Sequence, residues 1–541
     1  MTKKVAGIIL DGMEAVGIKT LYCLPGVQND NFFDVLYDRT DEFEVISTRH
    51  EQGAAYMAMG AALATGKPQA YCVVPGPGML NASGALVTAF GLAQPIFALH
   101  GQIRNHLIGK MTGQLHEIPD QVAVLDQMTK HAAGVYNNEE AVETVETAFS
   151  ELISGMPRPV AMEVPMDVWA APIDDAELPL TIKRTAPALD LEKVEAAAKL
   201  LGEAKNPLIV VGYGAQHVSA EVTQLAEMLQ APVNAFRTGR GVVDARHPMY
   251  VDWVSFYELW KSADVVVGIG TRLQSQQMGW GVDDNLKIIQ INIDAEEVNR
   301  HGTTAVGIHA DAADALPILL EKVTVYNHER TDRADELAAL QAQSAEKMAY
   351  LEPQNSFLKA IREALPEDGI FVEDLTQTGF VARVHYPVYQ PRTYISSGYP
   401  GTLGWGYATA LGVQHALPDR KVVLVSGDGG FMYNVAEVST AVKYDIPLVA
   451  VVFADGAYGN VKRIQQERYN NRTIASDLHN PDFVKLAESF GALGLRAHDA
   501  AELKEKIDEG FAAKRPTIIE VPVGEMPSPW PVIMQPKVRL A

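Results

Sequence analysis

One stretch decides how this chain folds: Lys421-Val422-Val423-Leu424-Val425-Ser426-Gly427-Asp428-Gly429-Gly430-Phe431. The continuous apolar run predicts a strand buried on both faces, and the glycines after it predict a tight turn into a helix. Glycines let the backbone approach a phosphate closely, and the free amides at a helix N-terminus favour negative charge there. The Asp428 carboxylate in this turn is an oxygen ligand of the kind that magnesium prefers. In isolation the motif also fits an ordinary strand-to-helix turn, so its interpretation depends on its surroundings.

A second carboxylate, Asp455, follows the next apolar run at 448–453. One expected helix and one expected strand separate it from Asp428. In a parallel sheet this spacing brings the carboxyl ends of two adjacent strands side by side, which is where α/β proteins bind ligands. Two carboxylates at this edge repel each other unless they share a cation, so the pair predicts a divalent-metal site.

Short apolar runs alternate with helical patterns along the whole chain, for example at 70–74, 207–211, 265–268, 421–425 and 448–453. Continuous runs suit strands buried on both faces, and the helices between them suit crossover connections. The sequence therefore predicts an α/β protein with doubly wound parallel sheets.

Two segments interrupt this alternation. Residues 170–190 are rich in Ala, Pro, Asp and Leu, and residues 326–356 are strongly charged and are expected to form an exposed connecting helix. Dividing the chain at these segments predicts three domains and a C-terminal tail, at 1–170, 190–325, 355–525 and 526–541.

The composition narrows the classes of partner. The 541 residues carry a net charge of −22, and an acidic surface repels nucleic acid and anionic lipid. The two cysteines, Cys23 and Cys72, are too few for a disulfide framework and lie in apolar runs typical of a core. No apolar run reaches the roughly 18 residues that a membrane span needs, and the N-terminus has no secretory pattern. We expect a cytoplasmic protein with neither nucleic acid nor membrane as a partner.

Near the N-terminus, an expected strand at 44–47 leads into Thr48-Arg49-His50-Glu51-Gln52-Gly53-Ala54-Ala55, which opens an expected helix. A glutamate in a first turn is ordinarily explained by the helix dipole. This segment, however, resembles the Arg-His-Glu-x-x-Ala-Ala run of the acetohydroxyacid synthase and benzoylformate decarboxylase group of thiamine diphosphate enzymes. Asp428 and Asp455 are similar to that family's Gly-Asp-Gly signature with a later Asn, except that Asp455 replaces the Asn. The resemblance implies that Glu51 is catalytic, because the family's glutamate hydrogen-bonds the aminopyrimidine ring and drives loss of the cofactor's C2 proton.

Further segments match the family in the same order, at 76–81, 376–379 and 397–406. A glycine-rich loop after a strand explains each match singly, but it does not explain their common order. By resemblance, 76–81 and 397–406 contact the pyrimidine, Leu403 separates the two rings, and 376–379 contacts the diphosphate. The resemblance implies that a divalent cation, magnesium or another, is held by the Asp428 and Asp455 side chains and the Ala457 carbonyl. The implied thiamine diphosphate-binding residues are Gly26, Glu51, Gly78, Asn81, Thr376, Gln377, Thr378, Gly401, Leu403, Gly427, Asp428, Gly429, Gly430, Asp455, Ala457 and Tyr458.

The same resemblance implies an assembly. Block 1–170 would be the pyrimidine-binding domain, 190–325 a central Rossmann-like domain and 355–525 the diphosphate-binding domain. In the family, the two domains that meet at one cofactor belong to different subunits. We therefore expect a homodimer at least, and a homotetramer as the full assembly.

The middle block contains Val211-Gly212-Tyr213-Gly214-Ala215-Gln216-His217, an incomplete dinucleotide fingerprint with His217 in place of the third glycine. A nicotinamide site is therefore not expected. Acetohydroxyacid synthases hold FAD in this domain through a Gly-Met-His-Gly stretch, where this chain has Tyr250-Val251-Asp252-Trp253-Val254-Ser255. FAD is therefore not expected either.

The stretch 101–117 resembles the synthase segment that ends in Ala-Phe-Gln-Glu. On this match Gln114 keeps the family's glutamine and is a catalytic candidate, while Gly113 replaces the phenylalanine and would widen the substrate pocket. His116 and Glu117 are candidates for moving protons, and a helix-capping or surface role explains them equally well.

The expected function is carboligation or decarboxylation of a small 2-oxo acid or aldehyde, acetolactate synthase-like with an altered pocket and dependent on thiamine diphosphate and magnesium. A 2-hydroxyacyl-CoA or hydroxyketone lyase is the alternative within this chemistry. A non-catalytic thiamine diphosphate-binding subunit and a nicotinamide oxidoreductase are alternatives from other classes. Glu51 distinguishes an enzyme from a non-catalytic subunit, because a non-catalytic subunit has no need of this glutamate.

Overall fold

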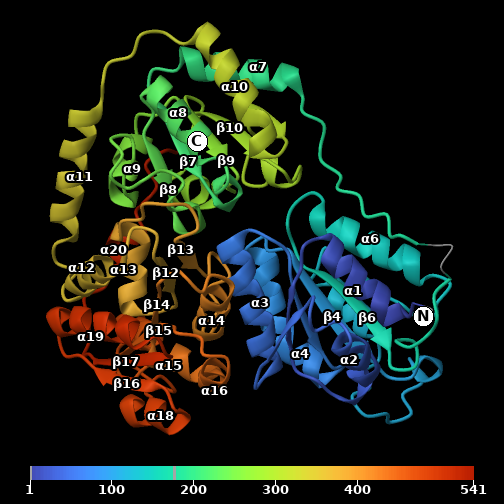
Figure 1. The fold of residues 1–541 in the computed structure, drawn as a ribbon. Coiled ribbons are helices and arrows are strands. Elements are labelled where there is room, and N and C mark those ends of the chain that lie inside the picture. Colours follow the sequence, from blue (N-terminus) through green and yellow to red (C-terminus); the bar gives the residue numbers. More distant parts are fainter. Residues whose placement is uncertain (1–2, 175–177, 541) are drawn as a thin grey trace.

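The computed structural model describes residues 3–174 and 178–540 and arranges them in three α/β domains, each built on a parallel sheet. From the N-terminal to the C-terminal domain, the strand orders are β2-β1-β3-β4-β6-β5, β11-β10-β9-β7-β8 and β13-β12-β14-β15-β17-β16. In the view of Figure 1 the central domain lies above the other two, which lie side by side. The expected fold class of three doubly wound parallel-sheet domains is confirmed.

The N-terminal domain contains a six-stranded sheet. Strands β3, β4 and β6 are buried along nearly their whole length, because helices cover both faces of the sheet. The strands are β1 (Thr20–Cys23), β2 (Glu44–Ser47), β3 (Gln69–Val73), β4 (Ile96–Gln102), β5 (His131–Gly134) and β6 (Val160–Pro165), and the helices are α1 (Val5–Ala15), α2 (Asp30–Tyr37), α3 (Glu51–Thr65), α4 (Pro77–Gly91), α5 (Gln121–Asp126) and α6 (Ala141–Ile153).

The central domain contains a five-stranded sheet and is followed by a connector. Three of its helices begin after an aspartate, Asp190, Asp252 or Asp311, whose carboxylate accepts first-turn N–H groups. The connecting helix α11 (Ala334–Met348) runs down the outer side of the molecule and is shorter than the expected 326–356 (Figure 1). The other elements are β7 (Pro207–Val211), β8 (Val233–Ala235), β9 (Val265–Ile269), β10 (Lys287–Asn292), β11 (Val306–His309), α7 (Leu191–Glu203), α8 (Ser219–Leu229), α9 (Trp253–Trp260) and α10 (Ala312–Tyr326).

The C-terminal domain contains the second six-stranded sheet. Strands β14 and β15 are adjacent and parallel, with Gly427 opposite Phe453, so their carboxyl ends lie side by side as expected. The strands are β12 (Ile370–Glu373), β13 (Tyr394–Ser396), β14 (Val422–Gly427), β15 (Val449–Ala454), β16 (Leu493–Arg496) and β17 (Thr517–Pro522). The helices are α12 (Gln354–Ala364), α13 (Gln377–His385), α14 (Gly406–Ala416), α15 (Asp428–Phe431), η8 (Met432–Glu437), α16 (Val438–Lys443), α17 (Gly459–Arg468), α18 (Phe483–Phe490), α19 (Ala500–Ala513) and α20 (Trp530–Ile533).

Helices α3 and α14 join the N-terminal and C-terminal domains (Figure 1). A Cβ on Gly60 would lie 2.0 Å from the Thr409 carbonyl oxygen, and one on Gly412 would lie 1.9 Å from the Met57 carbonyl oxygen. Only glycine permits backbones to approach this closely. One buried hydrophobic cluster therefore contains residues of both domains.

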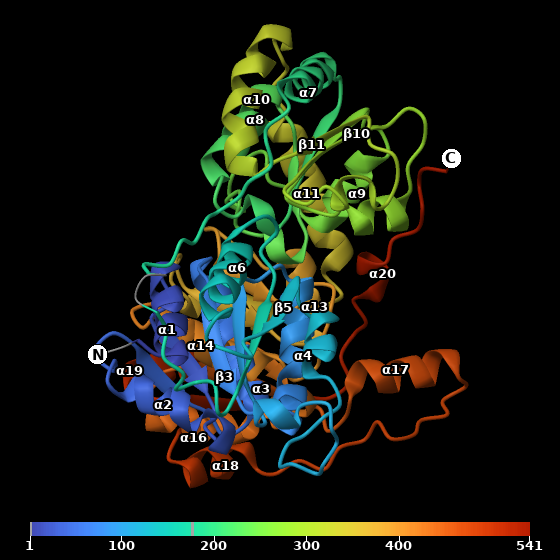
Figure 2. The same ribbon diagram turned by 90° about the vertical axis from the view of Figure 1, so that its right-hand side faces the viewer.

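The C-terminal tail returns from the C-terminal domain to the central domain (Figure 2). The Trp253 indole donates to the Ile533 carbonyl at 3.1 Å. Arg539 is 5% exposed, and its guanidinium donates to the Trp260 carbonyl and forms an ion pair with Asp283. These contacts fix the tail across the boundary between two domains.

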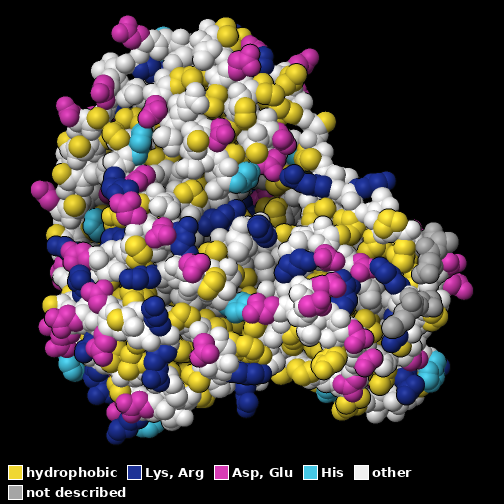
Figure 3. All heavy atoms as spheres, in the orientation of Figure 1, with side chains coloured by type: hydrophobic (Ala, Val, Ile, Leu, Met, Phe, Trp, Pro, Cys, Tyr) yellow, Lys and Arg dark blue, Asp and Glu magenta, His cyan; other side chains and the backbone are white. Residues whose placement is uncertain are grey.

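Acidic and basic side chains are interspersed over the surface (Figure 3). In this view, Lys and Arg side chains gather where the central domain meets the other two. Cys23 and Cys72 lie opposite each other on adjacent strands, and both are free thiols buried in the core. Within the two described ranges, no helix is long and apolar enough to cross a bilayer.

Candidate active site

The turn after β14 buries a carboxylate. Asp428 opens α15 and is 1% exposed. One carboxylate oxygen accepts the Gly429 N–H at 2.7 Å, and the other accepts the Gly456 N–H at 2.8 Å and the Asn480 side-chain amide at 2.6 Å. Charge-assisted bonds of this kind stabilise an ionised, oriented carboxylate.

Asp455 follows the adjacent strand β15, and its carboxylate accepts the Ala457 N–H at 3.1 Å. Burial, followed by the nearby charge of Asp428, raises the pKa of Asp455 from its usual value of 3.8 to about 6. A bound cation would reverse this effect, because it stabilises both carboxylates in their charged form. No group of three or more His, Cys, Asp or Glu side chains in the described ranges could hold an ion, so a cation between these two residues needs further oxygen ligands from backbone or phosphate.

A cavity of about 190 Å³ opens at these two strand ends. The glycines are required there, because a Cβ on Gly429 would lie 2.7 Å from the Tyr458 ring and one on Gly430 would lie 2.8 Å from the Asp374 carboxylate. A glycine cradle with two carboxylates at its edge fits a diphosphate bound through a cation. Ten residues proposed from the sequence line the cavity: Thr376, Gln377, Leu403, Gly427, Asp428, Gly429, Gly430, Asp455, Ala457 and Tyr458.

Two of the residues expected in the diphosphate-binding half lie outside this lining. Thr378, in α13, is fully buried, and its hydroxyl has no hydrogen-bond partner among residues 3–174 and 178–540. Gly401 lies in the loop before α14 and has a φ of +57°, which favours glycine.

The sequence did not single out three residues that hold this site together. Asn480 binds Asp428, as described above. Asp374 is fully buried, accepts the Ser426 hydroxyl at 2.9 Å, and has its pKa raised to about 6 by burial. Arg463 donates to the Gln377 side chain at 3.0 Å and to the Met526 carbonyl, which connects the cavity to the C-terminal tail. Of these, only Asp374 had a usable sequence signal, because it directly follows an apolar strand.

A second group of expected residues lies together in the N-terminal domain. Glu51 is the first residue of α3, and its carboxylate accepts the Asn81 side-chain amide of α4 at 3.0 Å. A Cβ on Gly78, in the first turn of α4, would lie 3.5 Å from the Glu51 carboxylate and 2.6 Å from Val74. A Cβ on Gly26 would lie 2.5 Å from the same Val74 side chain. The structure therefore brings four of the expected residues together: Gly26, Glu51, Gly78 and Asn81.

The loop before α5 places the remaining candidates differently. Gln114 is exposed, and its side chain donates to the Thr112 hydroxyl at 3.1 Å. His116 is half-buried with a φ of +69°, and its carbonyl packs against Gly76. Its Nδ1 has no hydrogen-bond partner in the part of the chain that the structure describes. Glu117 accepts three backbone N–H groups of this loop, which lower its pKa. Gly113 has a φ of +80°, which gives a backbone reason for glycine at that position.

The two groups of expected residues lie on different domains of the described chain. The lining of the 190 Å³ cavity comes wholly from residues 375–526, and it includes none of the residues around Glu51. Neither group by itself contains all the residues that the sequence proposes for the cofactor.

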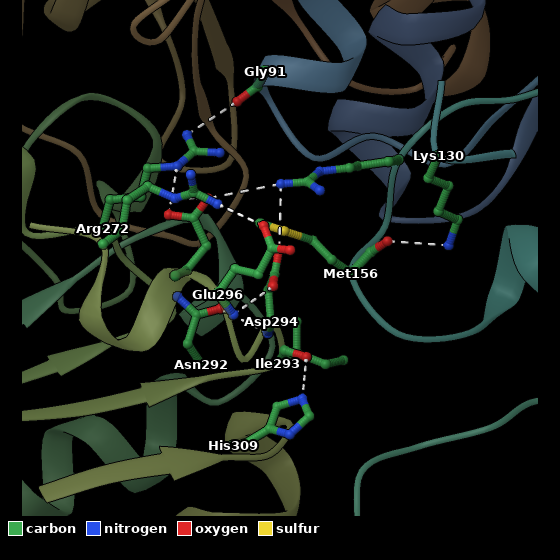
Figure 4. Close-up of polar contacts among 12 residues, drawn as sticks. Gly91, Lys130, Met156, Arg272, Asn292, Ile293, Asp294, Glu296 and His309 are labelled. Carbon is green, nitrogen blue, oxygen red and sulfur yellow. Dashed lines mark hydrogen bonds and ion pairs between the residues drawn. The ribbon is translucent and has the colours of Figure 1, made fainter. Parts of the chain in front are cut away.

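A larger cavity of about 390 Å³ lies where the central domain faces the other two, and residues of all three domains line it. It opens at the carboxyl ends of β7 and β9, beside Gly212, Gly214 and Gly270. Figure 4 shows its edge, where Arg272 donates to the Gly91 carbonyl and binds the buried Glu297. The sequence prediction that this domain holds neither FAD nor a nicotinamide remains a prediction.

Comparisons with known proteins agree with this arrangement. Three family models match in order: the N-terminal TPP binding domain of thiamine pyrophosphate enzymes at residues 3–124, their central domain at 194–319 and their C-terminal TPP binding domain at 374–521. The chain therefore belongs to the thiamine pyrophosphate (thiamine diphosphate) enzymes, and it is an enzyme that forms or breaks carbon–carbon bonds with this cofactor.

Within that class the chain is acetolactate synthase-like. It is 31% identical to the probable acetolactate synthase large subunit of Methanocaldococcus jannaschii, over 96% of this chain and 91% of that one. It is 29% identical to the acetolactate synthase isozyme 2 large subunit of Escherichia coli, over 97% and 96% of the two chains. It is also 28% identical to the probable 2-ketoarginine decarboxylase AruI of Pseudomonas aeruginosa, over 93% and 91%. The family resemblance expected from the sequence is confirmed.

Proposed function

We propose that this enzyme ligates or decarboxylates a small 2-oxo acid, using thiamine diphosphate and a divalent cation such as magnesium. The observation that carries the proposal is the pair of carboxylates, Asp428 and Asp455, on adjacent strand ends beside a glycine cradle. The names of the similar proteins, acetolactate synthase and 2-ketoarginine decarboxylase, support this class of reaction.

Each residue of the cavity has a distinct part in this proposal. Asp428, Asp455 and the Ala457 carbonyl would hold the cation, and the amides of Gly429 and Gly430 would face the diphosphate. Thr376, Gln377, Leu403 and Tyr458 would hold the cofactor by their place in the cavity lining, and Thr378 and Gly401 would complete its binding. Thiamine diphosphate supplies a carbon nucleophile and an electron sink when it is bound, which is the chemistry needed to break a bond next to a carbonyl.

Glu51 would move the proton that activates the cofactor. Its contact with Asn81 orients the carboxylate, and Gly78 leaves room beside it for a planar ring. A silent subunit would have no use for this oriented carboxylate, so its presence favours a catalytic chain.

We further propose that each active site is completed by two copies of the chain. The cavity and Glu51 lie on different domains, and Glu51 is absent from the lining of the cavity in its own chain. A dimer in which Glu51 of one copy faces the cavity of the other would produce two equivalent sites, and a homotetramer would contain two such dimers.

His116 and Gln114 would act on the substrate in this assembly. The half-buried His116 has an imidazole nitrogen without a partner among the described residues, and it packs on the loop that begins α4, close to the Glu51 group. The exposed Gln114 would become ordered only against the second copy. The small Gly113 beside it would leave space for a substrate different from that of the synthases.

The direct test is to incubate the purified enzyme with thiamine diphosphate, Mg²⁺ and a panel of 2-oxo acids and aldehydes, and to identify the products by mass spectrometry. With at least one 2-oxo acid, we expect the wild-type enzyme to release CO₂ or to form a new carbon–carbon bond. We expect neither product with Glu51→Gln. Turnover of a 2-oxo acid at the wild-type rate by Glu51→Gln would remove Glu51 from the mechanism. Cleavage of 2-hydroxyacyl-CoA esters alone would replace the proposal by the lyase alternative.

A further inference from the structure

A buried carboxylate of the C-terminal domain binds the backbone just before Glu51. Glu437, the last residue of η8, has no exposed surface. Its carboxylate accepts the N–H of Arg49 at 3.1 Å and the N–H of His50 at 3.0 Å. These residues connect β2 to α3, and Glu51 follows them directly.

The contact is tight on both sides. A Cβ on Gly53, in the first turn of α3, would lie 2.3 Å from the Glu437 carboxylate, so only glycine allows this approach. The Thr440 hydroxyl donates to the same carboxylate from the other side. Burial raises the pKa of Glu437, and these hydrogen bonds oppose that effect. Several donors on one buried carboxylate restrict its position strongly.

Glu437 is not needed as an ordinary cap of α3. The His50 imidazole already accepts the first-turn N–H of Gln52 at 3.1 Å. The N–H groups that Glu437 accepts belong to the two residues before the helix, so the carboxylate fixes the entry of the chain into α3. This entry sets where the Glu51 side chain starts and in which direction it projects.

The same segment also carries the diphosphate motif. Helix α15 begins at Asp428 and continues directly through η8 to Glu437. The segment 428–437 therefore lines a cavity at one end and holds the backbone before Glu51 at the other.

We propose that Glu437 is a positioning residue that holds Glu51 in the orientation needed to activate the cofactor. The inference rests on the proposed function, because it assigns Glu51 the proton-moving part. In a dimer with shared sites, segment 428–437 would connect the cation of one site to the activating glutamate of the other.

The test measures cofactor activation without any substrate. Enzyme loaded with thiamine diphosphate and Mg²⁺ is mixed into D₂O, quenched with acid, and the exchange of the cofactor's C2 proton is followed by NMR. Glu437→Ala removes the acceptor of both N–H groups, whereas Glu437→Gln keeps one oxygen for them. The matched control is Tyr444→Phe, because the Tyr444 hydroxyl accepts the Ser47 N–H at 2.8 Å across the same domain boundary but does not touch 49–53.

We expect Glu437→Ala to slow C2 exchange by about tenfold or more, because a shift on the order of 1 Å in a reacting group costs up to about a hundredfold in rate. Cofactor affinity, measured by calorimetry, should change by less than about threefold, since Glu437 is absent from the cavity lining. Glu437→Gln should recover most of the exchange rate, and Tyr444→Phe should retain the wild-type rate.

Exchange at the wild-type rate in Glu437→Ala would overturn the inference. Equal slowing in Glu437→Ala and Tyr444→Phe would also overturn it, because it would indicate a general loosening of the interface. Failure of the proposed function would look different. In that case the wild-type enzyme itself would not accelerate C2 exchange, and Glu51→Gln would be indistinguishable from it.

Discussion

Replacing Asp455 by Asn tests whether the two strand-end carboxylates share a cation. The pKa of Asp455 is raised to about 6 by burial and by the charge of Asp428. A cation binds the ionised carboxylate, so protons and cation compete for it. The asparagine side chain keeps an oxygen ligand and nearly the same shape, but it does not titrate.

The size of the effect follows from that pKa. With a pKa of about 6, the Asp455 carboxyl is roughly 90% ionised at pH 7 and roughly 10% ionised at pH 5. Because only the ionised carboxylate binds the cation, the affinity of the site for the cation falls about tenfold over this range, or ~1.4 kcal/mol. The direction is fixed by the sign of the shift. Affinity is present above the raised pKa and is lost as pH falls through it. With an unshifted value of 3.8, almost none of this loss would occur above pH 5.

The assay is titration calorimetry of Mg²⁺ into enzyme saturated with thiamine diphosphate, at pH 5, 6 and 7. The phosphates of the cofactor titrate as well, so the Asp455→Asn variant is measured in parallel and its pH dependence is subtracted. We expect the wild-type enzyme to lose about tenfold more affinity than the variant between pH 7 and pH 5. Parallel curves for the two proteins would refute the assignment of Asp455 to the cation.

Three further predictions concern the assembly, the packing and the central domain. Glu51→Gln and Asp428→Ala should each be inactive, but co-expressing the two variants should restore about a quarter of wild-type activity. Half of the dimers would then contain one copy of each variant, and each such dimer would have one intact shared site. No recovery of activity would show that the sites are not shared. Gly412→Ala should lower the free energy of unfolding by about 1–3 kcal/mol in denaturant titrations, because the new methyl group meets the Met57 carbonyl. The control is Gly7→Ala, which also lies in a helix but meets nothing within 4 Å of the described residues, and it should keep or slightly raise that free energy. The purified enzyme should show no flavin absorbance after acid extraction, whereas a stoichiometric flavin would contradict the interpretation of Tyr250–Ser255.

The local pattern was enough to predict the strand ends that carry the diphosphate half of the candidate site. The apolar run 421–425 and the glycines after it predict strand, turn and helix, and the structure has β14 and α15 there. It also brings Asp428 and Asp455 to adjacent strand ends, as their spacing predicts. These features depend on residues that lie close together in the chain, so they can be predicted from a single sequence.

Other contacts follow no local pattern. Asn480 reaches Asp428, and Arg463 reaches Gln377, only after helices and strands have been packed into layers. Glu437 lies beside Arg49 and His50 although 388 and 387 positions separate them in the sequence. No periodicity or spacing predicts such pairs.

The sequence by itself determined the class of fold, the order of the domains and the two ends of the proposed cofactor site, because these depend on burial patterns and on motifs read over short spans. Only the tertiary structure decided which side chains hold Asp428 and the backbone before Glu51 in place, namely Asn480 and Glu437. The physical reason is that these contacts join residues far apart in the sequence, which meet only when helices and strands pack closely, as α3 and α14 do through Gly60 and Gly412.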